Sequence, residues 1–354
     1  MQNATIKQSS IVFAIFLNLF GFLCYNNIIE RILNVMTKYL LTDTKNYYKA
    51  NLHCHTTDSD GQDTPAEMKE AHKAHGYSIL AYSDHDMVVP HPDLKDDEFL
   101  PLTAGEYGVS KKRDNGPFTY HTCHFNIISS VENVKEKPAW INREYSSESI
   151  SGMMKKARDE GYFVIYNHPV WSCENSNIYL NYNGMHAFEI MNYGSMSSGW
   201  NEYNDSIYDD MFRHGKRIFA VAGDDNHNHF GYETKRALPD WAGTYTVINA
   251  EKLEYDCVMD ALFKGNFYAS EGPSIYELKV EDNKVYVRTS ECRSIFCCNV
   301  GRKRGIAHMG PEKQPVTEAV FELLENQVYF RLTLIGIDGK KAYTNAYFLD
   351  ELNK

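Results

Sequence analysis

The stretch ANLHCHTTDSD at residues 50–60 places His53, His55 and Asp60 directly after a short apolar run. Two later segments repeat this arrangement, SDHD at residues 83–86 and GDDNH at residues 223–227. Imidazole and carboxylate are side chains that bind divalent metal ions well. Because each segment stands where a β-strand should end, the sequence predicts one metal site assembled from the ends of several strands.

The size and composition indicate an ordinary globular protein. A chain of 354 residues with 43% hydrophobic and 23% charged residues can bury a large core, and we expect one large domain and a smaller one. The formal net charge of −11 argues against sequence-specific nucleic-acid binding, which needs a basic surface. It does not exclude a phosphorylated substrate, because bound metal ions reverse the local sign of charge.

The eight cysteines show no CxxC pair and no spacing typical of a disulfide scaffold. Cys54 lies between two candidate metal ligands, where a disulfide would distort the site. We therefore expect free thiols and a reducing compartment.

The N-terminal part, residues 1–45, contains the apolar segment IVFAIFLNLFGFLCY at residues 11–25. This segment is shorter than the roughly 20 residues of a membrane-spanning helix, and Asn18 interrupts it. It is interpreted as a signal-peptide core, as an uncleaved anchor, or as sequence upstream of a true start at Met36. A cytoplasmic protein is the favoured interpretation, with membrane contact only if residues 11–25 act as an anchor.

Strands and helices alternate between residues 46 and 272. Apolar runs at 77–82 and 162–166 read as buried strands, whereas 64–76, 149–160 and 253–264 have helical spacing. Alternation of this kind predicts an α/β fold with a mostly parallel sheet. Because polar groups follow successive strands, a (β/α) barrel with its site at the carboxyl ends of the strands is expected.

After Gly272 and Pro273 the pattern changes to short strands without helices of useful length. Residues 273–354 are therefore predicted to form a small β-rich C-terminal domain.

Nine residues in these segments are candidate metal ligands. A zinc ion uses three or four protein ligands, so nine ligands indicate two or three divalent ions. Neighbouring ions of this kind are typical of phosphoester hydrolysis, where they activate water and stabilise the leaving oxygen. The candidates are His53, His55, Asp60, His85, Glu106, His124, His168, Asp225 and His227.

Some assignments compete with a neighbouring residue. His124 is preferred to His121 because it adjoins the apolar run 125–128, and Asp225 is preferred to Asp224 because of its spacing to His227.

Other residues near these segments are expected to act outside the ligand set. Asp84 is expected to orient an imidazole through its second nitrogen. Trp171 and Ser172 follow Pro169 and are expected either to line a substrate cleft or, for the tryptophan, to pack in the core. The candidate phosphate-binding cations are Lys111, Lys112, Arg113 and Arg236, each of which is also explained as a solvated charge.

The order of these segments resembles the motifs of the PHP (polymerase and histidinol phosphatase) family over residues 48–272. The matching segments are HCHT with SDG, SDHD, GE at 105–106, NHP at 167–169 and DxH at 225–227. Within that family the chain looks like the stand-alone PHP metallohydrolases related to the CehA/McbA group, and the stretches 267–273 and 341–345 also resemble the C-terminal part of that group. The last motif often reads GSDxH, and here Asp224 replaces the serine.

This resemblance implies a distorted (β/α)7 TIM-like barrel and a di- or trinuclear site for Mn, Fe or Zn. It also implies metal-dependent phosphoesterase activity on a small phosphorylated substrate, such as a nucleotide or another phosphomonoester, by metal-activated hydroxide. Asp225, His227 and His85 are the residues expected to act in catalysis. A carboxylic ester or carbamate hydrolase using the same ions, and a non-catalytic PHP module, remain alternatives.

Overall fold

A computed structural model describes residues 37–112, 120–134, 143–228, 240–299, 305–310 and 312–352. The predictions for residues 11–25, Met36, Arg113 and Arg236 lie outside these residues, as does the side chain of Lys112. Within the described part of the chain, none of the helices is both long and apolar enough to cross a membrane. The cysteines of this part are all free, as predicted.

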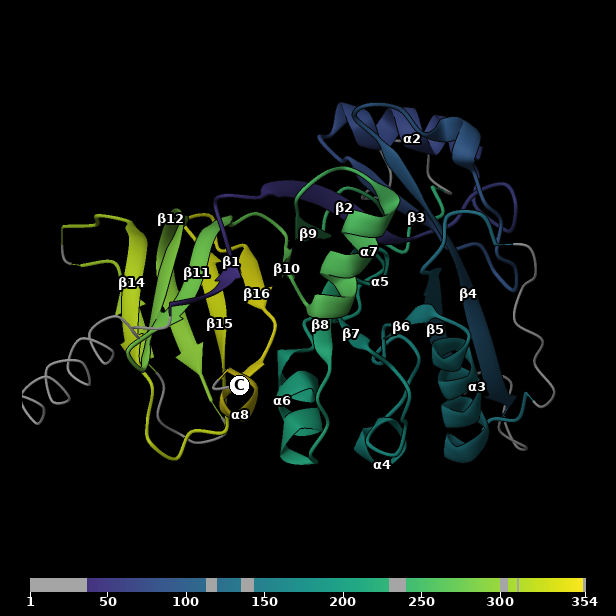
Figure 1. Ribbon diagram of the computed structural model, residues 1–354. Coiled ribbons are helices and arrows are strands. Elements are labelled where there is room, and N and C mark those ends of the chain that lie inside the picture. Colours follow the sequence, from purple (N-terminus) through teal and green to yellow (C-terminus); the bar gives the residue numbers. More distant parts are fainter. Residues whose placement is uncertain are drawn as a thin grey trace, which may run out of the picture.

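The described residues contain seven α-helices and one short 3-10 helix, η1 (Figure 1). The first helix starts as predicted, because the Thr64 hydroxyl accepts the Glu67 N–H and the Glu67 carboxylate accepts the Thr64 N–H. Three helices between residues 176 and 213 were not predicted. The bounds are α2 Pro65–Ala74, η1 Pro92–Leu94, α3 Ser147–Asp159, α4 Ser176–Tyr179, α5 Tyr193–Ser197, α6 Asp205–Arg213, α7 Tyr255–Lys264 and α8 Leu349–Leu352.

Nine strands build the mixed α/β part, drawn on the right of Figure 1. The ladders β2–β3–β4 and β6–β7–β8 are parallel, but β4–β5–β6 and β2–β9–β10 are antiparallel. The expectation of a mostly parallel sheet is therefore only partly confirmed. The bounds are β2 Asn46–Cys54, β3 Ile79–Tyr82, β4 Leu100–Lys112, β5 Tyr120–Ser129, β6 Tyr162–Tyr166, β7 Ala187–Asn192, β8 Phe219–Gly223, β9 Tyr245–Ala250 and β10 Phe267–Ser270.

One reason for the mixed sheet is that β4 extends beyond Glu106. It continues to Lys112 and pairs with β5 in an antiparallel register that places Gly108 opposite His124. Strands joined by a short connection pair in this antiparallel way, whereas a parallel pair needs a longer crossover. Glu106 and His124 consequently lie within long strands rather than at strand ends.

The sheet is not closed, so the predicted TIM-like barrel is not confirmed. Along its length β8 pairs with β7, and beyond its end the chain meets β2 only at the isolated bridge between Cys54 and Asn226. The strand conformation is interrupted at Asp225, whose φ of 53° lies in the left-handed region that L-residues seldom adopt. Regular pairing between β8 and β2 cannot continue through this residue.

The C-terminal strands form antiparallel ladders, drawn on the left of Figure 1. The longest of these strands, β12, has an irregular register near Cys292. The bounds are β11 Ile275–Glu281, β12 Lys284–Cys298, β13 Gly305–His308, β14 Val316–Glu322, β15 Tyr329–Gly336, β16 Lys341–Thr344 and β17 Tyr347–Phe348.

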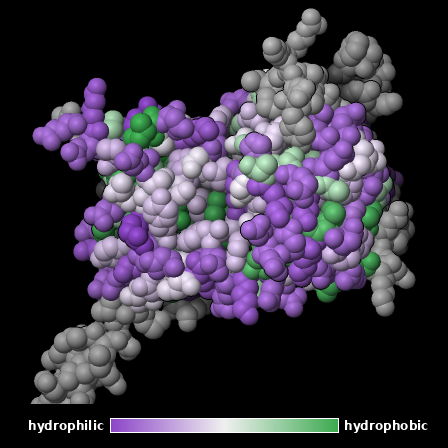
Figure 2. All heavy atoms as spheres, turned by 90° about the horizontal axis from the view of Figure 1, so that it is seen from above, coloured by the Kyte–Doolittle hydropathy of each residue, from purple (hydrophilic) through white to green (hydrophobic). Residues whose placement is uncertain are grey.

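Two ladders connect this C-terminal sheet to earlier parts of the chain. Strand β1 (Lys38–Leu41) pairs with β11, and β10 pairs with both β9 and β16. Hydrogen bonding therefore continues across the predicted domain boundary at residues 272–273, which stays a prediction. Figure 2 shows that one face of the molecule is largely hydrophilic, as the composition predicts.

A buried ion pair also joins the two parts. Arg331 on β15 is fully buried, and its Nε atom donates to Asp209 Oδ1 on α6 at 2.8 Å. The guanidinium also donates to Thr333 Oγ1 at 2.8 Å. A buried charge needs such partners, because removing one partner leaves the other charge uncompensated.

We expect Asp209→Ala to lower the free energy of unfolding by about 3–5 kcal/mol, because it leaves the Arg331 guanidinium buried without its counter-charge. Urea unfolding followed by circular dichroism measures this change. The control is Asp159→Ala, which removes an exposed pair with Lys155 and should change the free energy by less than about 0.5 kcal/mol. Equal losses in the two variants would contradict a structural role for the buried pair.

Candidate metal centre

Eight of the nine predicted ligands lie in two neighbouring groups. The ligand atoms within each group lie within 4.8 Å of one another. The buried group consists of His53, Glu106, His168 and Asp225, and the outer group consists of His55, Asp60, His85 and His227. The sequence segments that were expected to converge therefore do converge.

Two chain segments each contribute one residue to each group. His53 and His55 come from the end of β2, and Asp225 and His227 follow β8. The backbones are joined here, since Asp225 N donates to His53 O at 2.8 Å and His55 N donates to Asn226 O at 3.0 Å. Alternate residues of a strand point the same way but lie about 6.6 Å apart. They therefore serve adjacent groups, His53 the buried one and His55 the outer one.

Glu106 lies between the two groups. Its Oε1 atom lies 3.2 Å from His53 Nε2 and 3.3 Å from His168 Nε2. Its Oε2 atom lies 3.5 Å from His55 Nε2 and 3.2 Å from His85 Nδ1. One buried carboxylate thus presents one oxygen to each group.

Asp225 is the second shared acid. Its Oδ1 atom lies 3.1 Å from both His53 Nε2 and His55 Nε2, and its Oδ2 atom lies 3.6 Å from His168 Nε2. The two groups therefore meet at two carboxylates, which is an arrangement suited to two adjacent cations.

Asp224, the competing aspartate, has a different place. Its buried carboxylate accepts the backbone N–H groups of Ala242, Gly243 and Thr244. Burial raises the pKa of Asp224 to about 7, even though these hydrogen bonds act in the opposite direction. The structure thus places Asp225, and not Asp224, between the histidines.

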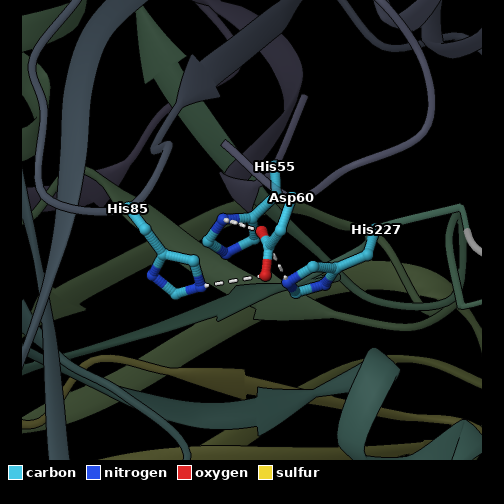
Figure 3. A group of neighbouring side chains, drawn as sticks. All are labelled: His55, Asp60, His85 and His227. Atoms are coloured by element: carbon cyan, nitrogen blue, oxygen red, sulfur yellow. Dashed lines mark ion pairs between the residues drawn. The ribbon is translucent and has the colours of Figure 1, made fainter. Parts of the chain in front are cut away.

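The outer group surrounds the carboxylate of Asp60 (Figure 3). The Asp60 Oδ1 atom lies 3.8 Å from His55 Nδ1 and 3.4 Å from His227 Nε2. The Asp60 Oδ2 atom lies 3.6 Å from His85 Nε2. The Asp60 side chain is 53% exposed and that of His85 is 33% exposed, whereas His53, Glu106 and His168 are buried. The outer group is therefore the one that solvent and ligands reach.

His124 lies beside the buried group without being part of it. Its Nδ1 atom lies 3.2 Å from Glu106 Oε1. A Cβ atom at residue 108 would lie 2.7 Å from His124 Nε2, so the glycine at this position leaves room for the imidazole. His121, the competing histidine, instead has its Nδ1 atom 2.7 Å from the Cys173 carbonyl. The preference for His124 agrees with this placement.

The residues present fit divalent metal ions. His53 Nε2 and His55 Nδ1 are buried and, among the described residues, accept or donate no hydrogen bond. Burial lowers the pKa of His168, but the hydrogen bond to Glu106 and the charge of Asp225 outweigh it and raise the pKa to about 9. The acids thus stabilise positive charge at the imidazoles. A divalent cation can supply this charge in place of the protons, because metal ions and protons compete for the same nitrogen atoms.

Glu189 on β7 is a functional residue that the sequence analysis missed. Its Oε1 atom lies 3.1 Å from His53 Nδ1, and its Oε2 atom accepts the His168 backbone N–H at 3.0 Å and the Asn192 amide at 2.9 Å. A carboxylate that holds the second nitrogen of a histidine fixes its orientation and raises its basicity. The available signal was an acid inside the apolar strand 187–192.

Asn51 joins the ends of β2 and β8 next to the centre. Its Oδ1 atom accepts the backbone N–H groups of His53 and Asp224, and its amide donates to Asn226 Oδ1 at 3.1 Å. The same amide lies 3.3 Å from His72 Nε2. This buried amide therefore holds the two segments that carry four of the ligands.

Two other expectations have mixed outcomes. Asp84 does not orient an imidazole, because its carboxylate accepts hydrogen bonds from the Thr56 backbone and from the hydroxyls of Thr56 and Ser59. It holds the loop that carries Asp60. Ser172 is buried with its hydroxyl 3.1 Å from His168 Nδ1, whereas Trp171 is partly exposed.

An arginine that was not among the predicted phosphate-binding residues lies near the centre. Arg143 donates to Asp86 Oδ1 at 2.6 Å and to the Gly108 carbonyl at 2.7 Å. Among the candidates, Lys111 is exposed on β4.

We expect Glu189→Gln to weaken metal binding by about 10- to 100-fold. The neutral amide raises the basicity of the His53 imidazole less than the carboxylate does, and it orients the ring less well. Titration of the metal-free protein with Mn²⁺ by calorimetry measures the effect. Glu202→Gln is the matched control, since Glu202 is equally buried but accepts the Trp171 backbone N–H instead of a ligand imidazole. Unchanged affinity in Glu189→Gln would contradict this role.

The His72 imidazole predicts a pH dependence of stability. Burial lowers its pKa from 6.5 to about 4, although the contact with the Met68 carbonyl acts against this change. As pH falls, the unfolded chain therefore binds this proton first, so the stabilisation is complete above pH 6.5 and is lost between pH 6.5 and about 4. In the metal-free protein, His72→Gln should reduce the slope of unfolding free energy against pH in this range, by at most about 1.4 kcal/mol per pH unit. An unchanged slope would show that His72 is not neutral in the folded state.

Comparisons with known proteins give limited similarity. No family model matches the chain, and no curated protein matches it. Among solved structures, it is similar to a two-domain protein from Bacteroides vulgatus that contains a predicted PHP-like metal-dependent phosphoesterase. The TM-score is 0.44 at 14% identity, over 87% of this chain and 97% of that one.

Two further structures match with a TM-score of 0.36 each. One is a candidate metal-dependent phosphoesterase from Bifidobacterium adolescentis, at 13% identity over 54% of this chain and 92% of that one. The other is an amidohydrolase from Chromobacterium violaceum, at 16% identity over 50% of this chain and 87% of that one. Of these three structures, the Bacteroides protein is the one described as PHP-like, and the sequence motifs resemble the same family.

Proposed function

We propose that this protein is a PHP-type metal-dependent phosphoesterase acting on a small phosphorylated substrate, such as a nucleotide or another phosphomonoester. The observation that carries the proposal is the pair of shared carboxylates, because Glu106 and Asp225 each face histidines of both groups. Two cations held at neighbouring positions suit the transfer of a phosphoryl group, whose oxygens carry negative charge.

The buried group and the outer group would each hold one divalent ion, with Mn, Fe or Zn as the candidates. His124, next to Glu106, would extend the donor set toward a third ion. When bound, such ions lower the pKa of a coordinated water toward neutrality and neutralise charge on a phosphoryl group.

The residues of the outer group would contact the substrate. His85 and Asp60 lie on the accessible side, so the substrate approaches from there. The His227 Nδ1 atom lies 3.1 Å from the Asp225 carbonyl, which leaves Nε2 directed toward Asp60. We assign His85 and His227 to contact with the substrate and Asp225 to the position between the ions. The proton for the leaving group would come from this accessible side.

Two structural predictions accompany this function. Residues 46–272 would act as the metallohydrolase domain with a barrel-like arrangement of strands, and residues 273–354 as a separate β-rich domain. An ester or carbamate hydrolase with the same ions, and a non-catalytic module, are the rival functions that the experiment must separate.

We expect His53→Ala and Asp225→Ala each to reduce Mn²⁺-dependent hydrolysis of p-nitrophenyl phosphate by at least about 1,000-fold, because each removes a donor atom of the centre. Steady-state kinetics with added Mn²⁺ measures the loss, and circular dichroism shows whether the variants stay folded. Glu98→Gln, a change at an exposed carboxylate outside both groups, is the control and should keep wild-type activity.

The same assay separates the rival functions. A chelator should abolish phosphoester hydrolysis without unfolding the protein, and carboxylate esters should be poorer substrates than phosphate esters. Turnover retained in His53→Ala or Asp225→Ala would refute the proposed role of the centre. Turnover of carboxylate esters alone would favour the rival hydrolase, and no turnover of either class would favour a non-catalytic module.

A further inference from the structure

A partly exposed tryptophan stands beside the metal centre. The Trp171 side chain belongs to the loop that follows β6, and the residue is 40% exposed. Its ring centroid lies 4.9 Å from that of His168 at an interplanar angle of 80° and 5.6 Å from that of His124. Both imidazoles contact Glu106, so the indole lies one residue away from the shared carboxylate.

The backbone around this tryptophan is held by buried groups. The Trp171 N–H donates to Glu202 Oε1 at 2.6 Å, and Glu202 is fully buried. The next residue, Ser172, binds the His168 imidazole through its hydroxyl, and its carbonyl accepts the Thr122 N–H at 3.2 Å. The backbone that carries the indole is therefore held beside His168 by buried groups.

The aromatic neighbours of this tryptophan lie at the centre. Trp171 belongs to none of the buried hydrophobic clusters of the described residues, and its ring contacts in this part of the chain are the two histidines. Trp200 is exposed to a similar extent, 42%, but shows no ring contact with a residue of the centre in the described structure. A partly exposed indole next to the centre offers a surface for a planar ring.

We propose that Trp171 forms one wall of the substrate site and stacks on a planar aromatic ring carried by the leaving group. The substrate class is then a phosphoester whose leaving group carries a planar aromatic ring close to the phosphorus, as in an aryl phosphate, rather than an alkyl phosphate. This inference rests on the proposed function, because the phosphoryl group must lie at the shared carboxylates for its leaving group to reach the indole.

The test compares two phosphonates that bind without being hydrolysed. Phenylphosphonate and methylphosphonate are titrated into the Mn²⁺-loaded full-length protein by calorimetry, so the readout is affinity and not turnover. We expect wild type to bind phenylphosphonate about tenfold more tightly than methylphosphonate, from one favourable aromatic contact. Trp171→Ala should remove most of this preference, Trp171→Phe should retain most of it, and Trp200→Ala should leave it unchanged.

The outcomes separate the inference from the function on which it rests. Equal wild-type affinities, or a preference that persists in Trp171→Ala, would overturn the inference while leaving the phosphoesterase proposal intact. An equal loss of affinity for both phosphonates in Trp171→Ala would also overturn it, since that result indicates a structural effect on His168. Absence of binding of either phosphonate to wild type would refute both proposals.

Discussion

The structure around the centre depends on one electrostatic constraint, which is that two shared carboxylates lie among six imidazoles in a largely buried site. Glu106 faces His53, His55, His85, His124 and His168, and its side chain is almost completely buried. Burial alone would raise the pKa of Glu106, but the charges of His124 and His53 hold the pKa well below its usual range. A buried carboxylate kept ionised requires positive charge nearby. Protons on the imidazoles or divalent cations between them both meet this requirement.

The place where the sheet stays open is the place where the centre forms. A regular β8–β2 ladder would direct successive side chains to opposite faces, whereas the left-handed conformation of Asp225 turns the chain out of that pattern. Asn51 then replaces the missing ladder with side-chain hydrogen bonds to His53, Asp224 and Asn226. Irregular backbone at a functional site is tolerated when its surroundings hold it in this way. Stability of the β2–β8 junction and geometry of the centre are therefore coupled.

Those ligands that adjoin a strand end in the sequence could be predicted from the sequence alone. His53, His55, Asp225 and His227 were predictable because apolar runs and adjacent polar residues identify strand ends within a few residues. Glu189 and Arg143 were missed because their roles depend on which strands and loops become neighbours, which no local pattern encodes. The antiparallel β5 and the pairing of β1 with β11 were missed for the same reason. The α/β class was predicted correctly, whereas the sheet stays open because β9 occupies the edge of β2 along residues 46–50, a pairing that no local pattern encodes.

The two groups differ in exposure, so a ligand can approach the centre from the side of the outer group. The buried group comes from the ends of β2, β6 and β8 and from Glu106 on β4, and it is less exposed than the outer group. The outer group opens through Asp60 and His85, and the His85 ring lies 5.7 Å from that of His124, which in turn adjoins Trp171. The accessible edge therefore runs from the charged outer group to an aromatic wall. On the proposed function, a ligand that spans this edge would combine an anionic end with an apolar, planar end, and this combination would distinguish it from inorganic phosphate.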